Sequence, residues 1–443
     1  MSNRPPARTL PLLYLGTAHV SLALAFLVAA CWPQAVAGFF YHSWLVGLVH
    51  LITLGWISFS ILGAVFIVGP IAMRMPIRPR RADYVAFAFA VVGLTGMVGH
   101  FWIQEYGGMA WSACTIASAI LFMTVRILAA LRPAAIERAV KVHIVLACVN
   151  FWIAASMGLL IAIDKVAHFL PGFILANVFA HAHLAALGWA TMMVVGVGYR
   201  LLPMLLPSKM PSGWTVYLTA ALLELGVLGL FAALLVRSTA AAAFGGLVVA
   251  GLAAFGTQIW WMLRHRVAKP LGTSNVDFAL LHAAGAGVSL LAAVGIGLML
   301  LARPSSPAML HAAGAYGVFG LVGFLAQIVV GMETRLLPMA TWYWAYAASR
   351  YSIPPASPHT MRDRSLQAIV FAAWTVGVPA LAAGMYVESA TLVAAGAWAL
   401  LSAVAFAGLD NAFVIAHAFG GPPVLHARSA VESRLGRAAR TAE

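Results

Sequence analysis

Charged residues are scarce in this sequence. Only 9% of its 443 residues are Asp, Glu, Lys or Arg, whereas 63% are hydrophobic. A soluble domain carries many more charged residues on its surface, so the composition excludes a soluble globular fold. Apolar stretches of about twenty residues recur along the whole chain, which indicates an all-α protein that crosses a membrane many times.

Cysteine is scarce as well. The three cysteines, Cys31, Cys114 and Cys148, each lie inside an apolar run, and no CxxC motif occurs. These facts exclude covalently attached c-type haem, cysteine-held iron–sulfur clusters and a disulfide framework.

Acidic residues are fewer than basic ones, 12 against 26, which gives a formal net charge of +14. In a soluble chain this excess would suggest a nucleic-acid partner. Here the basic residues lie in short segments between apolar runs, where the positive-inside rule accounts for them. We therefore expect a lipid bilayer and no nucleic acid as partner.

The apolar runs predict twelve transmembrane helices in one domain that covers residues 1–443. Their expected extents are 9–32, 43–70, 83–103, 108–131, 142–163, 174–202, 213–236, 241–263, 277–302, 308–334, 366–386 and 391–418. The segment from about 340 to 365 is expected to be a connecting loop, and residues 419–443 a cytoplasmic tail. The first run resembles a signal peptide, but its apolar core is too long for one.

Basic residues are distributed unevenly between the two sides of these spans. Only three of the 26, Lys165, Arg237 and Arg303, fall in loops on one side. The positive-inside rule then places both termini in the cytoplasm of a bacterial cell, with the protein in the inner membrane.

Short motifs recur along the chain and predict a four-helix unit used three times, over about 9–131, 142–263 and 277–418. HLITLGW begins at His50 and HLAALGW at His183, and each is followed at the same distance by a proline, Pro70 and Pro203. YRLLPM from Tyr199 recurs as TRLLPM from Thr334. Spans one, five and nine align through histidines: His19, His143 and His282.

Three histidines, His50, His181 and His183, lie at one depth of the second and sixth spans. An intramembrane histidine is costly and marks a functional site by default. Side chains two residues apart on a helix diverge by about 200°, so His181 and His183 serve different ligands. Since His50 and His183 occupy equivalent positions, we expect them to face each other across one haem, with His181 ligating a second haem or a metal.

Other intramembrane polar residues admit two interpretations each. Glu224 and Asp410 are candidates for a proton path, or else buried and paired polar groups. His311 and His282 are candidates for part of a metal site. Arg200 and Arg335 are interpreted as anchors at the cytoplasmic interface.

The segment HAHLAALGW…YRLLP, from His181 to Pro203, resembles the catalytic subunit of the haem-copper oxidases, most closely that of the C-family (cbb-type) cytochrome oxidases. That family has HVHSGALGW on its HxH helix, followed by a Tyr-x-Leu-x-Pro-like end. The resemblance implies that His181 ligates a high-spin haem and that His183 and His50 ligate a low-spin haem. It also implies twelve helices in three four-helix arcs, with haems toward the outer face and c-type haem subunits as partners.

The chain departs from that family in two respects. The HxH helix is the sixth span here and the tenth in the oxidases. The copper-binding His-Pro-Glu-Val-type segment is missing, and no two histidines are adjacent, so the sequence leaves copper open. The chain also resembles the NnrS family of twelve-helix haem-and-copper membrane proteins linked to nitric oxide stress, which carries a WHAHEMLFGF segment and a similarly placed proline.

Together these features predict a membrane protein that binds one or two b-type haems and performs electron transfer or O₂ or NO chemistry. Such a protein would be an oxidoreductase resembling a terminal oxidase or nitric oxide reductase, supplied by electron-donor subunits or cytochromes. A non-catalytic, NnrS-like haem protein in nitric oxide tolerance is one alternative. A transporter with repeated helical units is another.

Overall fold

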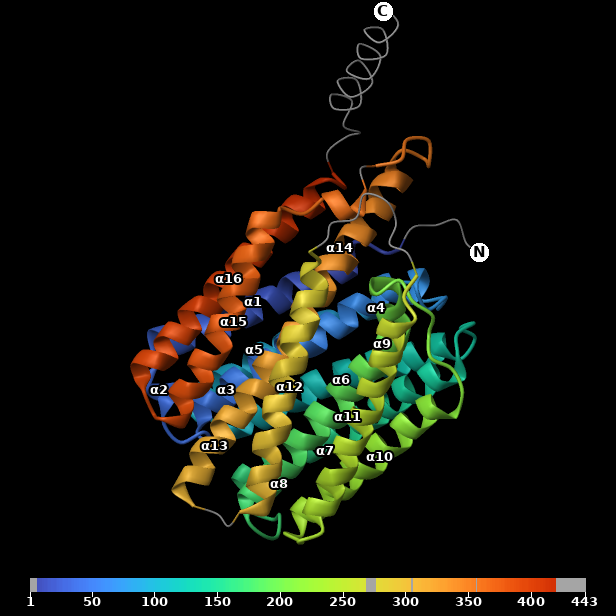
Figure 1. The fold of residues 1–443 in the computed structure, drawn as a ribbon. Coiled ribbons are helices and arrows are strands. Elements are labelled where there is room, and N and C mark those ends of the chain that lie inside the picture. Colours follow the sequence, from blue (N-terminus) through green and yellow to red (C-terminus); the bar gives the residue numbers. More distant parts are fainter. Residues whose placement is uncertain (1–5, 268–275, 304–305, 356, 420–443) are drawn as a thin grey trace, which may run out of the picture.

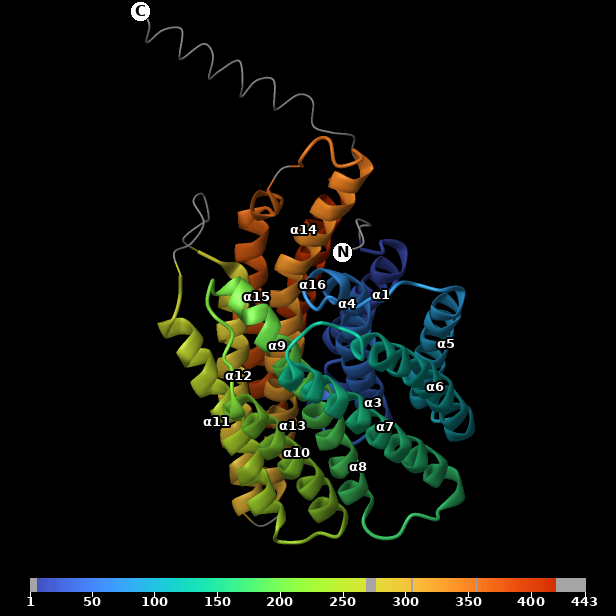
Figure 2. The same ribbon diagram turned by 90° about the vertical axis from the view of Figure 1, so that its right-hand side faces the viewer.

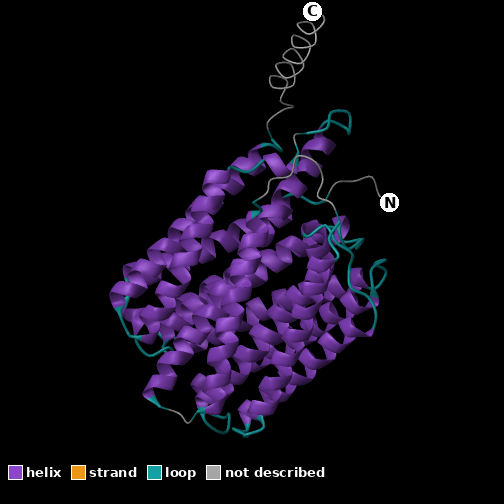
Figure 3. Ribbon diagram, in the orientation of Figure 1, coloured by secondary structure: helices purple, strands orange, loops and turns teal. Residues whose placement is uncertain are grey.

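The computed structural model describes residues 6–267, 276–303, 306–355 and 357–419, and in these ranges the regular structure is entirely helical (Figure 3). Twelve helical segments in them are long and apolar enough to cross a membrane. Each of these segments carries few charged residues and is therefore compatible with the lipid interior. There, the backbone polar groups of a single segment are satisfied by the hydrogen bonds of a helix. The chain is therefore a multi-pass integral membrane protein, as its sequence predicts.

The helices fall into three consecutive sets of four spans, which we call units 1, 2 and 3 (Figure 1). Unit 1 contains α1 (Thr9–Cys31), the short α2 (Gln34–Ala37), a second span made of α3 (Ser43–His50), η1 (Leu51–Ser58) and α4 (Phe59–Ile71), then α5 (Arg81–Ile103) and α6 (Tyr106–Leu131). Unit 2 contains α7 (Arg138–Ala167), a second span made of α8 (Ile174–His183), η2 (Leu184–Thr191) and α9 (Met192–Leu205), then α10 (Trp214–Leu235) and α11 (Ala241–Arg264). Unit 3 contains α12 (Phe278–Ala302), a second span made of α13 (Pro307–Gly317), η3 (Val318–Ala326) and α14 (Gln327–Ala348), the short η4 (Pro358–Thr360), then α15 (Arg364–Tyr386) and α16 (Ala390–Ala416).

The predicted loop over about 340–365 was wrong in its first part, because α14 continues to Ala348. The continuation is stabilised by Trp344, which is buried and donates a hydrogen bond from Nε1 to the carbonyl of Pro6 at 3.1 Å. Aromatic side chains at this depth suit the membrane interface, so they extend the helix beyond the purely apolar stretch. The expected tail at 419–443 lies outside the described residues from 420 onward.

The three units form a closed ring. Unit 1 contacts unit 2 through α6 and α7, unit 2 contacts unit 3 through α11 and α12, and α16 packs on α1. Figure 1 shows α1 next to α15 and α16, while Figure 2 shows α5 and α6 at one edge and α11 at the other. The second spans of all three units meet in the middle through η1, η2 and η3.

Those middle segments are π-helical in every unit. Counted from the proline that follows, their starting positions agree to within one residue. A π-helix leaves carbonyl groups without their usual partners. Hydroxyl groups use them in two units: Ser58 Oγ donates to Thr53 O at 2.9 Å, and Thr191 Oγ1 donates to Ala186 O at 2.9 Å. Since π-helical segments often occur at functional sites, their presence in all three units draws attention to the residues beside them.

Glycines bring the first helix of each unit close to the second. A Cβ built on Gly196 of α9 would meet the Cβ of His143 on α7 at 2.6 Å, and one on Gly331 of α14 would meet the Cβ of His282 on α12 at 2.9 Å. Small residues at such contacts let the backbones approach, which is the main packing device available in lipid.

The equivalent contact in unit 1 corrects the expected alignment of the first helices. Gly63 of α4 packs against Tyr14 of α1, with 3.0 Å between a built Cβ and the Tyr14 Cβ. Tyr14 therefore holds the place of His143 and His282, whereas His19 lies more than a turn further along the helix.

Twelve crossings place the start of α1 and the end of α16 on the same face, which we call the terminal face. The long connection between α14 and α15 also lies there, and the turn between α15 and α16 lies on the opposite face. This defines the depth of every polar residue below.

Candidate functional site

His50 and His183 are the last residues of α3 and α8, directly before the π-helices η1 and η2. The corresponding residue before η3 is Gly317, so unit 3 lacks this histidine. His181 lies two residues before His183 on α8. All three histidine side chains are half-buried in the half of the bundle away from the terminal face.

The Nδ1 atom of each ring is held by a backbone carbonyl. His50 is bound to Val46 O and His183 to Phe179 O, each at 2.8 Å and one turn back on the same helix. His181 differs, because its Nδ1 reaches across to Ala154 O of α7 at 2.9 Å. A carbonyl acceptor requires Nδ1 to carry the proton, which leaves the lone pair on Nε2. This is the arrangement that metal-ligating histidines use.

The Nε2 atoms differ in their partners. Nε2 of His183 accepts a hydrogen bond from the hydroxyl of Tyr316 on α13 at 3.1 Å, and the two rings stack. No described residue hydrogen-bonds to Nε2 of His50 or of His181, and neither atom is sealed off from accessible space. An imidazole nitrogen with a free lone pair, deep in a membrane protein, is a candidate ligand for a bound group.

His181 and Tyr316 hold the same position in units 2 and 3, counted back from Pro203 and Pro338. Both rings lie over a glycine of the first helix of their own unit, namely Gly158 for His181 and Gly297 for Tyr316. From there the Tyr316 hydroxyl crosses to His183 of unit 2. His181 accordingly faces unit 1.

His50 and His181 lie within the range over which the charge of one ring acts on the other. His50 also stacks on Phe101 of α5, with ring centroids 5.5 Å apart. The expected pairing of His50 with His183 stays a prediction, and the contact that the structure shows at Nε2 of His183 is the one with Tyr316.

The tryptophans that follow the two histidines lie on the central axis. Trp56 Nε1 donates to Ala326 O of unit 3 at 3.2 Å, and Trp189 Nε1 donates to Ser58 Oγ of unit 1 at 3.0 Å. Both side chains are buried, and their hydrogen bonds link the three units next to the histidine site.

The two candidate metal ligands of unit 3 lie apart from the three histidines. Nε2 of His311 is 3.1 Å from the Glu388 carboxylate, beside a cavity of about 90 Å³ near the face opposite the termini. His282 is buried against Phe371 on the terminal side. Within the described ranges no three His, Cys, Asp or Glu side chains come together as a metal site.

The two candidate carboxylates of the proton path are both hydrogen-bonded. Glu224 accepts from Asn150 Nδ2 at 2.8 Å. Asp410 is buried and paired with Arg362, whose Nη1 lies 2.5 Å from Oδ2. The structure thus shows a partner for each of these carboxylates.

The basic residues interpreted as anchors make specific contacts at the terminal face. Arg200 Nε donates to Ala72 O at 2.8 Å. Arg335 pairs with Asp277 and donates to Nδ1 of His359 at 2.7 Å. Burial lowers the pKa of His359, the positive charge of Arg335 acts in the same direction, and Asp277 opposes them. A neutral His359 is the form that can accept the Arg335 hydrogen bond.

Sequence reasoning missed Tyr316, Arg362 and Glu333. Counting back the same number of residues from Pro203 and from Pro338 would have shown that Tyr316 is equivalent to His181 in the repeat. Arg362 gave no signal, because it lies in a loop among other basic residues, and Glu333 lay at the edge of its expected span.

Searches for relatives return no matching family model and no matching curated protein. The class that the fold and composition establish is a twelve-span polytopic membrane protein.

Proposed function

We propose that this protein is a b-type haem-binding integral membrane protein related to the haem-copper oxidase class, and that it transfers electrons in a bacterial inner membrane. His50 and His181, one from each of units 1 and 2, would hold the haem iron. The observation that carries the proposal is that both rings present an accessible, unpartnered Nε2 while Nδ1 is fixed by a carbonyl.

The donor set suits haem better than a bare metal ion. Two neutral imidazoles are the axial pair of many b-type cytochromes, whereas a structural metal site needs three or four donors. No such larger donor group exists among the described residues. The proposal therefore contains one haem and no copper.

A haem held by the imidazoles of His50 and His181 would supply one-electron transfer. The contribution of the chain is to orient both rings. Ala154 O fixes the ring of His181, and Phe101 packs on the ring of His50. This favours electron transfer over binding of O₂ or NO.

The test is the haem content and the reduced-minus-oxidised visible spectrum of the purified protein. We expect a b-type spectrum from the wild type, and loss of most haem in His50→Ala and in His181→Ala. His183→Ala should keep its haem, because its Nε2 is engaged with Tyr316. His265→Ala is the matched control, since His265 makes the same one-turn Nδ1 bond at an exposed helix end.

Three outcomes would contradict parts of this proposal. A wild-type protein without haem would refute the haem function and favour the transporter alternative. Loss of haem in His183→Ala with retention in His181→Ala would restore the His50–His183 pair. A spectral shift of the reduced protein on adding carbon monoxide would reveal an open axial position and favour the gas-binding, NnrS-like alternative.

A further inference from the structure

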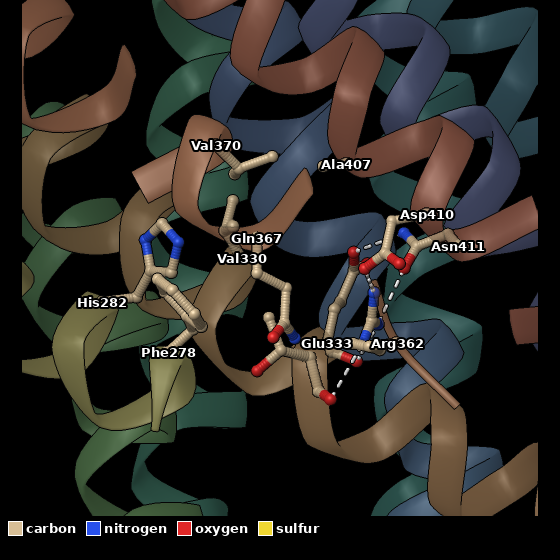
Figure 4. Close-up of a pocket in the computed structure, with 11 residues that line it drawn as sticks. Phe278, His282, Val330, Glu333, Arg362, Gln367, Val370, Ala407, Asp410 and Asn411 are labelled. Atoms are coloured by element: carbon tan, nitrogen blue, oxygen red, sulfur yellow. Dashed lines mark hydrogen bonds and ion pairs between the residues drawn. The ribbon is translucent and has the colours of Figure 1, made fainter. Parts of the chain in front are cut away.

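A second polar cluster lies on the terminal side of unit 3 (Figure 4). It contacts His19 on α1 of unit 1. At its centre the guanidinium of Arg362, which belongs to the loop before α15, is inserted between α14 and α16. Its donors reach two side chains and two backbone carbonyls: Asp410 Oδ2 at 2.5 Å, Asn411 Oδ1 at 2.8 Å, Glu333 O at 2.8 Å and Thr334 O at 2.9 Å. Four of the five N–H donors of the guanidinium thus end on an oxygen.

The charges of Arg362 and Asp410 cancel. Burial lowers the pKa of Arg362, but the adjacent carboxylate of Asp410 raises it again, and a guanidinium in such a pair stays charged. Asp410 also accepts from the backbone N–H of Asp363 through its other oxygen, at 3.1 Å. Asp410 is therefore fully paired and has no need of a proton.

Glu333 is a second carboxyl group in the same cluster, and it has no cation of its own. It is buried, and its Oε2 lies 3.4 Å from Nε2 of His19 and 3.4 Å from Nδ2 of Asn411. An uncompensated carboxylate in such a place would be costly, so one proton must reside on Glu333 or on His19.

The hydrogen bonds assign that proton to Glu333. Asn411 accepts from Arg362 through Oδ1, so its other atom is the amide nitrogen and must donate. That nitrogen lies 3.1 Å from Nε2 of His19, which therefore carries a lone pair. Nδ1 of His19 faces the carbonyl of Leu15 at 3.1 Å and so carries the hydrogen. His19 is thus neutral and Glu333 is left as the protonated acid.

The remaining oxygen of Glu333 adjoins a small cavity. Oε1 has no hydrogen-bond partner, and Glu333 lines a cavity of about 20 Å³. His282 lines the same cavity from α12; it is buried, and its Nδ1 is also unpartnered. Figure 4 shows its ring across from Glu333. A polar cavity of this size has room for about one water molecule.

We propose that Glu333 is a proton-binding site that exchanges its proton through water in this cavity, with His282 as the acceptor. The O–H bond of Glu333 breaks, its proton passes to the water, and the water gives a proton to Nδ1 of His282. Glu333 becomes a carboxylate and His282 an imidazolium, so the charge of the region is unchanged.

The surrounding groups favour a proton over a metal cation as the ligand. The titratable or charged groups around Glu333 are His19 on α1, Arg362 in the loop, Asp410 on α16 and His282 on α12. The guanidinium of Arg362 already supplies the positive charge that a bound cation would bring. The site is separate from His50 and His181, so it stands independently of the proposed haem function.

The experiment is infrared spectroscopy of the purified protein in lipid nanodiscs. A protonated carboxylic acid has a C=O stretching band that carboxylates lack, and exchange into D₂O shifts it. We expect this band in the difference between wild type and Glu333→Gln, with a deuterium shift that shows exchange with solvent. Glu388→Gln, at an exposed carboxylate on the opposite face, is the control and should leave the band in place.

Two further variants keep the test decisive if Glu333→Gln fails to fold. Glu333→Asp keeps an acid and should retain a band at a shifted frequency. His282→Phe removes the acceptor and should slow the deuterium exchange of the wild-type band. Absence of the band in the wild type, or its persistence in Glu333→Gln, would overturn the proposal, and so would unchanged exchange in His282→Phe.

Discussion

Tyr316 distinguishes His183 from the other two histidines. Its hydroxyl donates a hydrogen bond to Nε2 of His183, whereas Nε2 of His50 and of His181 has no hydrogen-bond partner among the described residues. Tyr316→Phe should remove one hydrogen bond and leave His183 with an unpartnered nitrogen, at a cost of about 1–3 kcal/mol in stability. Thermal unfolding of the purified protein measures this, with Tyr217→Phe on the lipid-facing surface as the control. Haem content should stay at the wild-type level, and a large loss would mean that His183 is an iron ligand.

The sequence contains the histidines of this site but does not signal the contact between His183 and Tyr316, for a reason that concerns symmetry. Motif repetition relates His50 to His183, and like positions seem natural partners. In a ring of repeated units, however, an interface joins two different faces of the unit, as in any heterologous association. Off the axis, equivalent residues therefore never meet. His183 contacts Tyr316 because these two positions lie on complementary faces of neighbouring units.

At the level of helices, the contact between the first and second span of each unit depends on glycine. Gly196→Ala should destabilise the protein by about 1–3 kcal/mol, because the added methyl group would press on the Cβ of His143 and overpack the α7–α9 contact. Gly246→Ala on α11 is the matched control, since its Cβ would meet nothing within 4 Å. Both changes gain the same helix propensity, so the difference in melting temperature isolates the packing term. Equal melting temperatures would contradict the close approach.

Hydropathy predicts the spans well and their internal geometry poorly. Except at the tenth span, where α14 continues to Ala348, the expected boundaries lie within a few residues of the helix ends, because the length of an apolar run is set by the membrane thickness. Nothing in an apolar composition distinguishes a π-helix from an α-helix, so η1, η2 and η3 could not be predicted. Their positions depend on contacts between units, such as the hydrogen bond from Trp56 to Ala326 O.

At the scale of the whole molecule, the ring of three units is closed and its axis is filled. Trp56, Trp189 and Phe324 are equivalent in the repeat and buried where the π-helices meet. Hydrogen bonds of Trp56 and Trp189 link the units at this point, so large buried side chains occupy the place where the three units meet. Sites for ligands therefore belong between units or within a unit, as with the His50–His181 interface and the Glu333 cavity.

The orientation of the molecule in its membrane follows from its loops. Twelve crossings bring the start of α1 and the end of α16 to one face, and loop residues such as Arg200 and Arg335 lie at that face. Since basic loops are retained in the cytoplasm, we expect the terminal face to be cytoplasmic.

Reporter fusions after Lys209 and at the C-terminus should behave as cytoplasmic, and a fusion after Arg303 as external. An alkaline phosphatase and green fluorescent protein pair measures both sides, because each is active on one side only. An external C-terminus would contradict the orientation, and it would place the Glu333 cluster toward the outer solution.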